Sequence, residues 1–187
     1  LPGLWRLRLP LPWEGIPHVN AFAIAHPDGG AILVDCGSAG HPTLSDALLR
    51  ALGETPWAPE EIRQLVLTHY HSDHAGLAAS LIEASGCSVL GHPAVEHFTD
   101  GTTRPEEIAA ARRHRAWQEG VPDDLLDMVA DVTEEVMGIE APIAPDVALV
   151  EGDLIPSALG DWEVIETPGH APTHLCLLQR ERGILVA

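Results

Sequence analysis

The chain has 187 residues, 45% of them hydrophobic, which is enough to close one sizeable core. Its 28 acidic residues against ten basic ones give a formal net charge of -18, a negative field that repels phosphates and disfavours nucleic acid as a partner. No apolar run reaches the roughly 20 residues of a membrane span, and the opening LPGLWRLRLPLPW is unlike a signal peptide. Three cysteines lie far apart in apolar sequence, which indicates reduced thiols rather than disulfides and favours a cytoplasmic protein. We expect no membrane partner.

The first third of the chain predicts strands. Residues 4–9 alternate apolar residues with arginine, NAFAIAH follows, and AILVD comes after the turn PDGG. Short strands separated by tight turns are typical of an antiparallel arrangement, so we predict a β-meander.

Helices then alternate with strands. HPTLSDALLRALG has apolar residues at helical spacing and a stop at Gly53, and a helical turn after Pro59 leads into a strand over 64–68. A second helix is predicted over 75–86, followed by the strand CSVL. This alternation indicates an α/β layered domain, which we place over 1–187.

Segment 93–145 differs because it carries two helix patterns and no strand pattern, so we predict a helical insertion within the domain. Thr103 and Glu106 form a candidate capping box, and Gly120 ends the first helix. An apolar stripe marks the second helix: Leu125, Val129, Val132 and Val136. Strand patterns resume with DVALV, WEVIET, HLCLL and GILVA.

The stretch THYHSDHAGL places three histidines and an aspartate within six residues, directly after a predicted strand. His69 and His71 lie two apart, so an extended backbone points both imidazoles to the same side, as a metal-binding pair requires. Asp73 and His74 follow where the loop turns into a helix, and they can project toward a second, adjacent metal position. These ligand types suit zinc, and equally iron(II) or manganese. The alternative is a polar loop that is rich in histidine by chance. Random placement of the chain's 11 histidines would seldom produce this spacing.

His170 is a candidate third ligand, because Pro168 and Gly169 make a turn that can present its side chain at a strand edge. His174 starts the next strand and is predicted to pack beside the ligands and support them. Asp35 ends a strand, and it is either a turn residue or a buried carboxylate that orients the ligand loop. Three further histidines are expected in solvent without a role: His92, His97 and His114.

THYHSDHAG resembles the T-H-x-H-x-D-H signature of the metallo-β-lactamase superfamily, and especially of its glyoxalase-II-like hydrolases. HVNAFAIAHPDGGAILVDCG resembles the early strands of that family, and ETPGHAPTHLCLL resembles the segment that delivers its third histidine. The resemblance covers nearly the whole chain except 93–145. It implies a four-layer αββα sandwich, of which this α/β chain would hold the first half together with a helical insertion.

The resemblance also implies the ligand sets. The first metal site would consist of His69, His71 and His170. Asp73 and His74 would begin the second site, and the presence of His74 favours the broader hydrolase branch over true β-lactamases. The family's bridging aspartate and last histidine would follow the strand GILVA, beyond Ala187. We therefore expect these 187 residues to hold at most one metal tightly and to hydrolyse substrates poorly on their own.

The implied activity is hydrolysis of a small thioester, lactone or other ester. One or two zinc ions would lower the pKa of a water to about 7, and Asp73 would orient the resulting hydroxide or relay its proton. The insertion is predicted to lie over the metal-facing edge of the sheet as a lid. The alternatives are a mononuclear iron persulfide dioxygenase of the same superfamily and a non-catalytic fragment. Assembly into a homo-oligomer stays open.

Overall fold

A computed structural model describes residues 1–13, 15–95, 104–133 and 137–187. Its first sheet has the order β1-β2-β3-β4-β5-β6. The strands are β1 Leu4–Pro10, β2 His18–Ala25, β3 Ala31–Val34, β4 Ile62–Val66, β5 Ser88–Gly91 and β6 Val147–Ala148. Strands β1 to β3 pair antiparallel, which confirms the predicted meander, and β3 to β6 pair parallel. Parallel neighbours need long crossovers, which the helices supply here.

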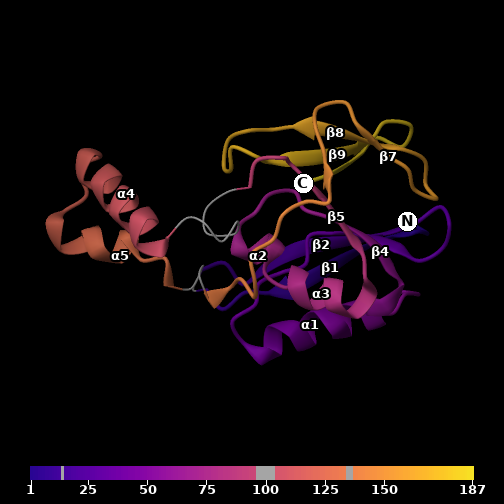
Figure 1. Ribbon diagram of the computed structural model, residues 1–187, viewed down its shortest axis with the longest axis horizontal. Helices are drawn as coiled ribbons and strands as arrows, with labels where there is room; N and C mark the ends of the chain where they lie inside the picture. The colour runs from indigo at the N-terminus through magenta and orange to yellow at the C-terminus, as the bar shows by residue number, and fades with distance from the viewer. Residues whose placement is uncertain (14, 96–103, 134–136) are drawn as a thin grey trace.

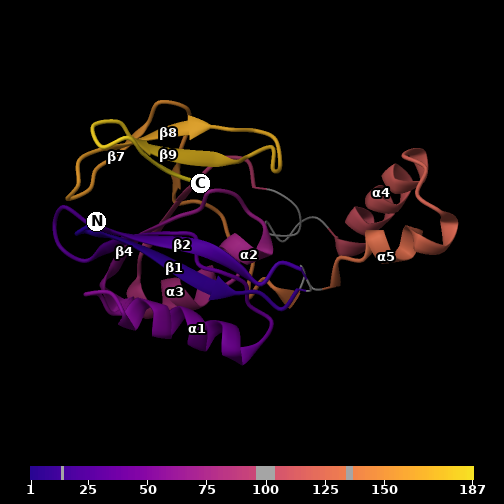
Figure 2. The same ribbon diagram turned by 180° about the vertical axis from the view of Figure 1, so that it is seen from behind.

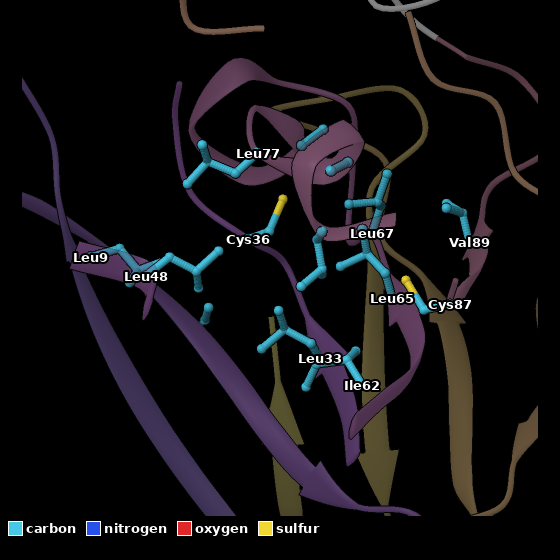
Figure 3. Packing of buried hydrophobic residues seen from close by; sticks show 14 of the residues in the cluster. Leu9, Leu33, Cys36, Leu48, Ile62, Leu65, Leu67, Leu77, Cys87 and Val89 are labelled. Atoms are coloured by element: carbon cyan, nitrogen blue, oxygen red, sulfur yellow. The ribbon is translucent and has the colours of Figure 1, made fainter. Parts of the chain in front are cut away.

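Two helices cover one face of this sheet, α1 (Pro42–Gly53) and α3 (Ala78–Ser85), as Figure 1 shows. Helix α1 begins after His41, whose side chain accepts a hydrogen bond from the amide of Thr43, and its apolar positions face the sheet. The core between helices and sheet includes Leu48 of α1, Leu33 of β3 and Leu65 of β4, which are labelled in Figure 3. The helix predicted in HPTLSDALLRALG, residues 41–53, is therefore confirmed, with His41 as its N-cap.

The second sheet packs on the other face of the first (Figures 1 and 2). Its antiparallel order is β10-β9-β8-β7. The strands are β7 Leu154–Ile155, β8 Trp162–Glu166, β9 Leu175–Gln179 and β10 Ile184–Val186. Trp162 is fully buried between the sheets, in one apolar cluster with Ile32 and Val66 of the first sheet. The described residues thus form three layers, helices, sheet and sheet, in the order that the αββα prediction requires.

The second predicted helix, 75–86, begins later in the structure: most of it forms α3, and its first residue, Ala75, ends a separate helix. A single turn, α2 (Ser72–Ala75), precedes α3, and the chain bends between them. The break has a tertiary cause, because the amide of Leu77 donates to the carbonyl of Gly37 instead of continuing the helix. Gly76 also lies so close to the segment that contains Gly138 that an added Cβ would collide with the carbonyl oxygen of Gly138. The predicted strand 64–68 is displaced by two residues, to Ile62–Val66.

The insertion is helical where it is described. It contains α4 (Pro105–Gln118), a 3-10 turn η3 (Asp123–Leu125) and α5 (Leu126–Ala130). Arg104, rather than a capping threonine, occupies the N-cap of α4. Two predicted features, Thr103 and Val136, lie outside the described residues.

The insertion helices pack on each other and stand beside the sandwich, at the end where α2 lies (Figures 1 and 2). Ala116, Leu126 and Ala130 are buried, and Arg113 pairs with Asp127 at 2.8 Å. The two helices thus bury part of their apolar surface against each other. The cover over the metal-facing edge stays a prediction. None of the described helices has the length and apolarity needed to span a bilayer.

Candidate metal centre

The candidate site lies where the parallel strands end. Asp35 follows β3 directly, and the segment 68–71 follows β4, so both reach the same edge of the first sheet. The loop between β8 and β9 brings His170 from the second sheet to this edge. The amide of Leu175 donates to the carbonyl of Thr68 at 2.8 Å and ties the two sheets together beside the site.

His69, His71 and His170 come together at this edge. One ring nitrogen from each histidine lies within 4.8 Å of the other two. The ring centroids are 4.6 Å apart for His69 and His71, and again 4.6 Å for His71 and His170. The structure therefore gathers the three predicted ligands of the first metal from two different sheets.

The donor atoms fit a metal ion. His69 is buried, and its Nε2 atom has no hydrogen-bond partner among the described residues. Burial, and then the neighbouring imidazoles, lower the pKa of His69 far below its ordinary value, so its ring is neutral and carries a lone pair. A buried polar atom without a partner is rare in proteins, and a divalent cation that accepts this lone pair would satisfy it.

Asp73 and His74 lie next to this group. His74 Nε2 is 3.4 Å from Asp73 Oδ2, and the rings of His74 and His69 have centroids 4.1 Å apart. Burial lowers the pKa of His74, but the carboxylates of Asp35 and Asp73 outweigh it and raise the pKa to about 10. Burial raises the pKa of Asp73, yet its contacts with His74 bring the net pKa below the usual value. Without a metal the two side chains thus form an ion pair.

Asp35 is buried at the centre of the site. Its Oδ2 atom lies 2.7 Å from His74 Nδ1. Its carboxylate also accepts from the amide and the hydroxyl of Thr68, both at 2.8 Å. The backbone of Asp35 has φ 60, a left-handed conformation that aspartate tolerates better than most residues. Of its two predicted roles, these contacts favour a carboxylate that orients the ligand loop.

His174 lies beside the cluster, with its ring centroid 5.1 Å from that of His69 and its Nδ1 atom 2.7 Å from the hydroxyl of Thr167. His92 accepts from the amide of Ala94, and His114 stacks on Trp117 in the insertion, so neither belongs to the cluster. His97 lies outside the described residues.

Sequence reasoning missed Thr68, whose hydroxyl lies 3.1 Å from His69 Nδ1. Its position directly before the first histidine of the motif was the one available signal.

Comparisons with known proteins give a consistent picture. The family model of the metallo-β-lactamase superfamily matches residues 15–187. A hydroxyacylglutathione hydrolase from Cereibacter sphaeroides is 27% identical over 162 residues, which cover 84% of this chain and 46% of that protein. A probable metallo-hydrolase from Bacillus subtilis is 29% identical over 128 residues, or 68% of this chain and 44% of that protein.

Similarity to solved structures points to the same family as the family model. The crystal structure of a metallo-β-lactamase family protein from Thermus thermophilus is similar with a TM-score of 0.77 at 27% identity, and the match covers 100% of this chain and 59% of that one. The chain thus spans about half the length of the curated relatives that it matches.

Proposed function

Because the chain belongs to the metallo-β-lactamase superfamily, as its histidine motif predicted, we propose that it is a metal-dependent hydrolase of a thioester, lactone or other small ester. The observation that carries the proposal is the convergence of three imidazoles, one of which, His69, has a buried Nε2 atom with no hydrogen-bond partner in the part of the chain that the structure describes. Such a set of three nitrogen ligands leaves a coordination position open, which is the arrangement of catalytic rather than structural sites.

The chemistry divides between the ion and the side chains. A zinc ion, or iron or manganese in its place, supplies Lewis acidity toward a carbonyl oxygen and lowers the pKa of a bound water. His69, His71 and His170 would hold this ion. The lowered pKa of Asp73 keeps its carboxylate anionic at neutral pH. We assign to Asp73 the task of orienting the attacking water and accepting its proton at a carboxylate oxygen.

Two observations support the substrate class. Relatives named hydroxyacylglutathione hydrolase favour an acyl group carried on a thiol, so we place thioesters first. The formal charge of -18 disfavours a polyanionic substrate. Three free, buried cysteines agree with a reducing compartment, and we keep the cytoplasm as the proposed location.

The test is a substrate panel with controlled metal content. The intact protein is stripped with a chelator, reloaded with zinc, iron(II) or manganese, and assayed on thioesters, lactones, simple esters and phosphodiesters. We expect turnover of a thioester or lactone to vanish on stripping and to return with metal. We also expect His71→Ala to lose it, and His114→Ala, an exposed histidine of the insertion, to retain it. Ester turnover that survives both stripping and His71→Ala would sink the proposal.

A further inference from the structure

The hydrogen bonds around Asp35 fix where protons lie in the candidate metal centre. An ionised carboxylate can only accept hydrogen bonds, so each of its close partners must donate. The amide of Thr68 donates to Oδ1 at 2.8 Å, and the hydroxyl of Thr68 donates to Oδ2 at 2.8 Å. His74 Nδ1, 2.7 Å from Oδ2, must likewise carry a proton. Asp35 is 2% exposed, so no bulk water competes for these contacts.

The proton of the Thr68 hydroxyl is therefore already committed to Asp35. The same oxygen lies 3.1 Å from His69 Nδ1. Since the hydroxyl has one proton only, the histidine must be the donor in this second contact. His69 then carries its proton on Nδ1, and its Nε2 atom, which is buried and has no hydrogen-bond partner among the described residues, presents a lone pair. The lowered pKa of His69 agrees with a neutral ring.

We propose that Thr68 is a positioning residue that holds His69 in the tautomer able to bind metal, and that Asp35 acts on His69 through Thr68 and on His74 directly. One carboxylate would thus set the proton positions of one histidine from each predicted metal site. The two rings lie side by side, with centroids 4.1 Å apart. The inference rests on the proposed metal centre but concerns this chain's own protons, which can be observed without a substrate.

Removal of the hydroxyl has a defined consequence. In Thr68→Val the side chain keeps its shape, but His69 Nδ1 loses its acceptor in a buried position. The ring can then place its proton on Nε2, where the proton blocks the atom that would bind metal. Loss of such supporting hydrogen bonds typically lowers metal affinity about 10–100-fold. Thr68→Ser keeps the hydroxyl and should restore both the tautomer and the affinity.

The experiment reads tautomer and affinity separately in the intact protein. Long-range nitrogen–proton NMR spectra of the metal-free protein, assigned with His69→Gln, report which ring nitrogen of His69 carries the proton. Competition with a chromophoric chelator gives the zinc affinity. We expect the Nδ1-protonated form in the wild type and in Thr68→Ser. In Thr68→Val we expect a shift toward the Nε2-protonated form and zinc affinity lower by about 10–100-fold.

A matched control is Thr167→Val, which removes another threonine hydroxyl that contacts a histidine Nδ1, in His174, at 2.7 Å. It should leave the His69 tautomer unchanged. The proposal is overturned if wild-type His69 is protonated on Nε2, a result that needs no variant to fold. It is also overturned if folded Thr68→Val keeps wild-type tautomer and affinity, or if Thr68→Ser is as impaired as Thr68→Val. A protein that shows the expected tautomer and zinc affinity but hydrolyses no ester would contradict only the proposed function.

Discussion

Asp35 is the residue on which most of the site's internal contacts converge. Its carboxylate accepts from Thr68 twice and from His74 once, and it is nearly inaccessible to water. The amide and hydroxyl of the buried Thr68 and the Nδ1 atom of the partly buried His74 would each lose this acceptor if the carboxylate were removed. The side chain that organises the site therefore also stabilises the fold.

Substitution of Asp35 should accordingly destabilise the protein, and alanine should cost more than asparagine. Each buried donor left unpaired costs about 1–3 kcal/mol. Alanine at φ 60 adds about 1–2 kcal/mol of backbone strain, which asparagine largely avoids. Urea unfolding measures both variants, with Asp28→Ala, an exposed turn aspartate, as the control expected to stay within about 0.5 kcal/mol. A stability of Asp35→Ala equal to that of the control would contradict this account.

The histidine motif shows what local sequence can reveal at this scale. His69, His71, Asp73 and His74 were predictable because their chemistry is concentrated in six residues, and His170 was predictable from its turn and from the family resemblance. The hydrogen bonds that connect Asp35 to His69 through Thr68 were not predictable. They depend on a carboxylate 33 positions away, and no spacing rule connects a threonine to such a partner.

At the scale of elements, prediction succeeded where the pattern was local. The helix in HPTLSDALLRALG and the meander have clear periodicity and clear stops, and the structure contains both. The helix predicted over 75–86 breaks because the amide of Leu77 finds the carbonyl of Gly37, a contact between distant segments. Strand β7 was missed because a strand of two residues has no periodicity to detect.

The break between α2 and α3 gives a second stability prediction. A Cβ at position 76 would collide with the carbonyl oxygen of Gly138 and lie 2.6 Å from the amide nitrogen of Ala39. Gly76→Ala should therefore destabilise the protein by about 1–3 kcal/mol through overpacking.

Gly53→Ala is the matched control, because that helical glycine has no atom within 4 Å of an added Cβ. It should be neutral or stabilising by up to about 1 kcal/mol. Thermal or urea unfolding of both variants checks the pair, and equal stability of the two would show that the backbone at position 76 has room to move.

For the whole molecule, the two central histidines predict how the stability of the metal-free protein depends on pH. Between pH 6.5 and about 10 the folded state keeps the proton of His74 that the unfolded chain releases, so stability falls as pH rises through this interval. Below pH 6.5 the unfolded chain protonates His69 and the folded state does not, so stability falls as pH is lowered. These two groups together place the maximum of the free energy of unfolding near pH 6.5.

Urea unfolding of the chelator-treated protein across this pH range measures the effect. His74→Gln should flatten the alkaline limb while leaving the acid limb in place. A wild-type alkaline limb that is as flat as that of the variant would show that His74 does not hold its proton in the folded protein.

The close approach of Gly76 to Gly138 also bears on how this chain can vary between species. The last part of the insertion, after α5, is tied to the body of the protein, because the amide of Ala39 donates to the carbonyl of Gly138 and Ser80 donates twice to the carboxylate of Glu140. Helices α4 and α5 lie beyond this attachment and pack mainly on each other. We expect natural variants to differ freely in the length and number of helices between positions 105 and 130, while position 76 stays glycine. Diversity would then accumulate beside the histidine cluster without disturbing it.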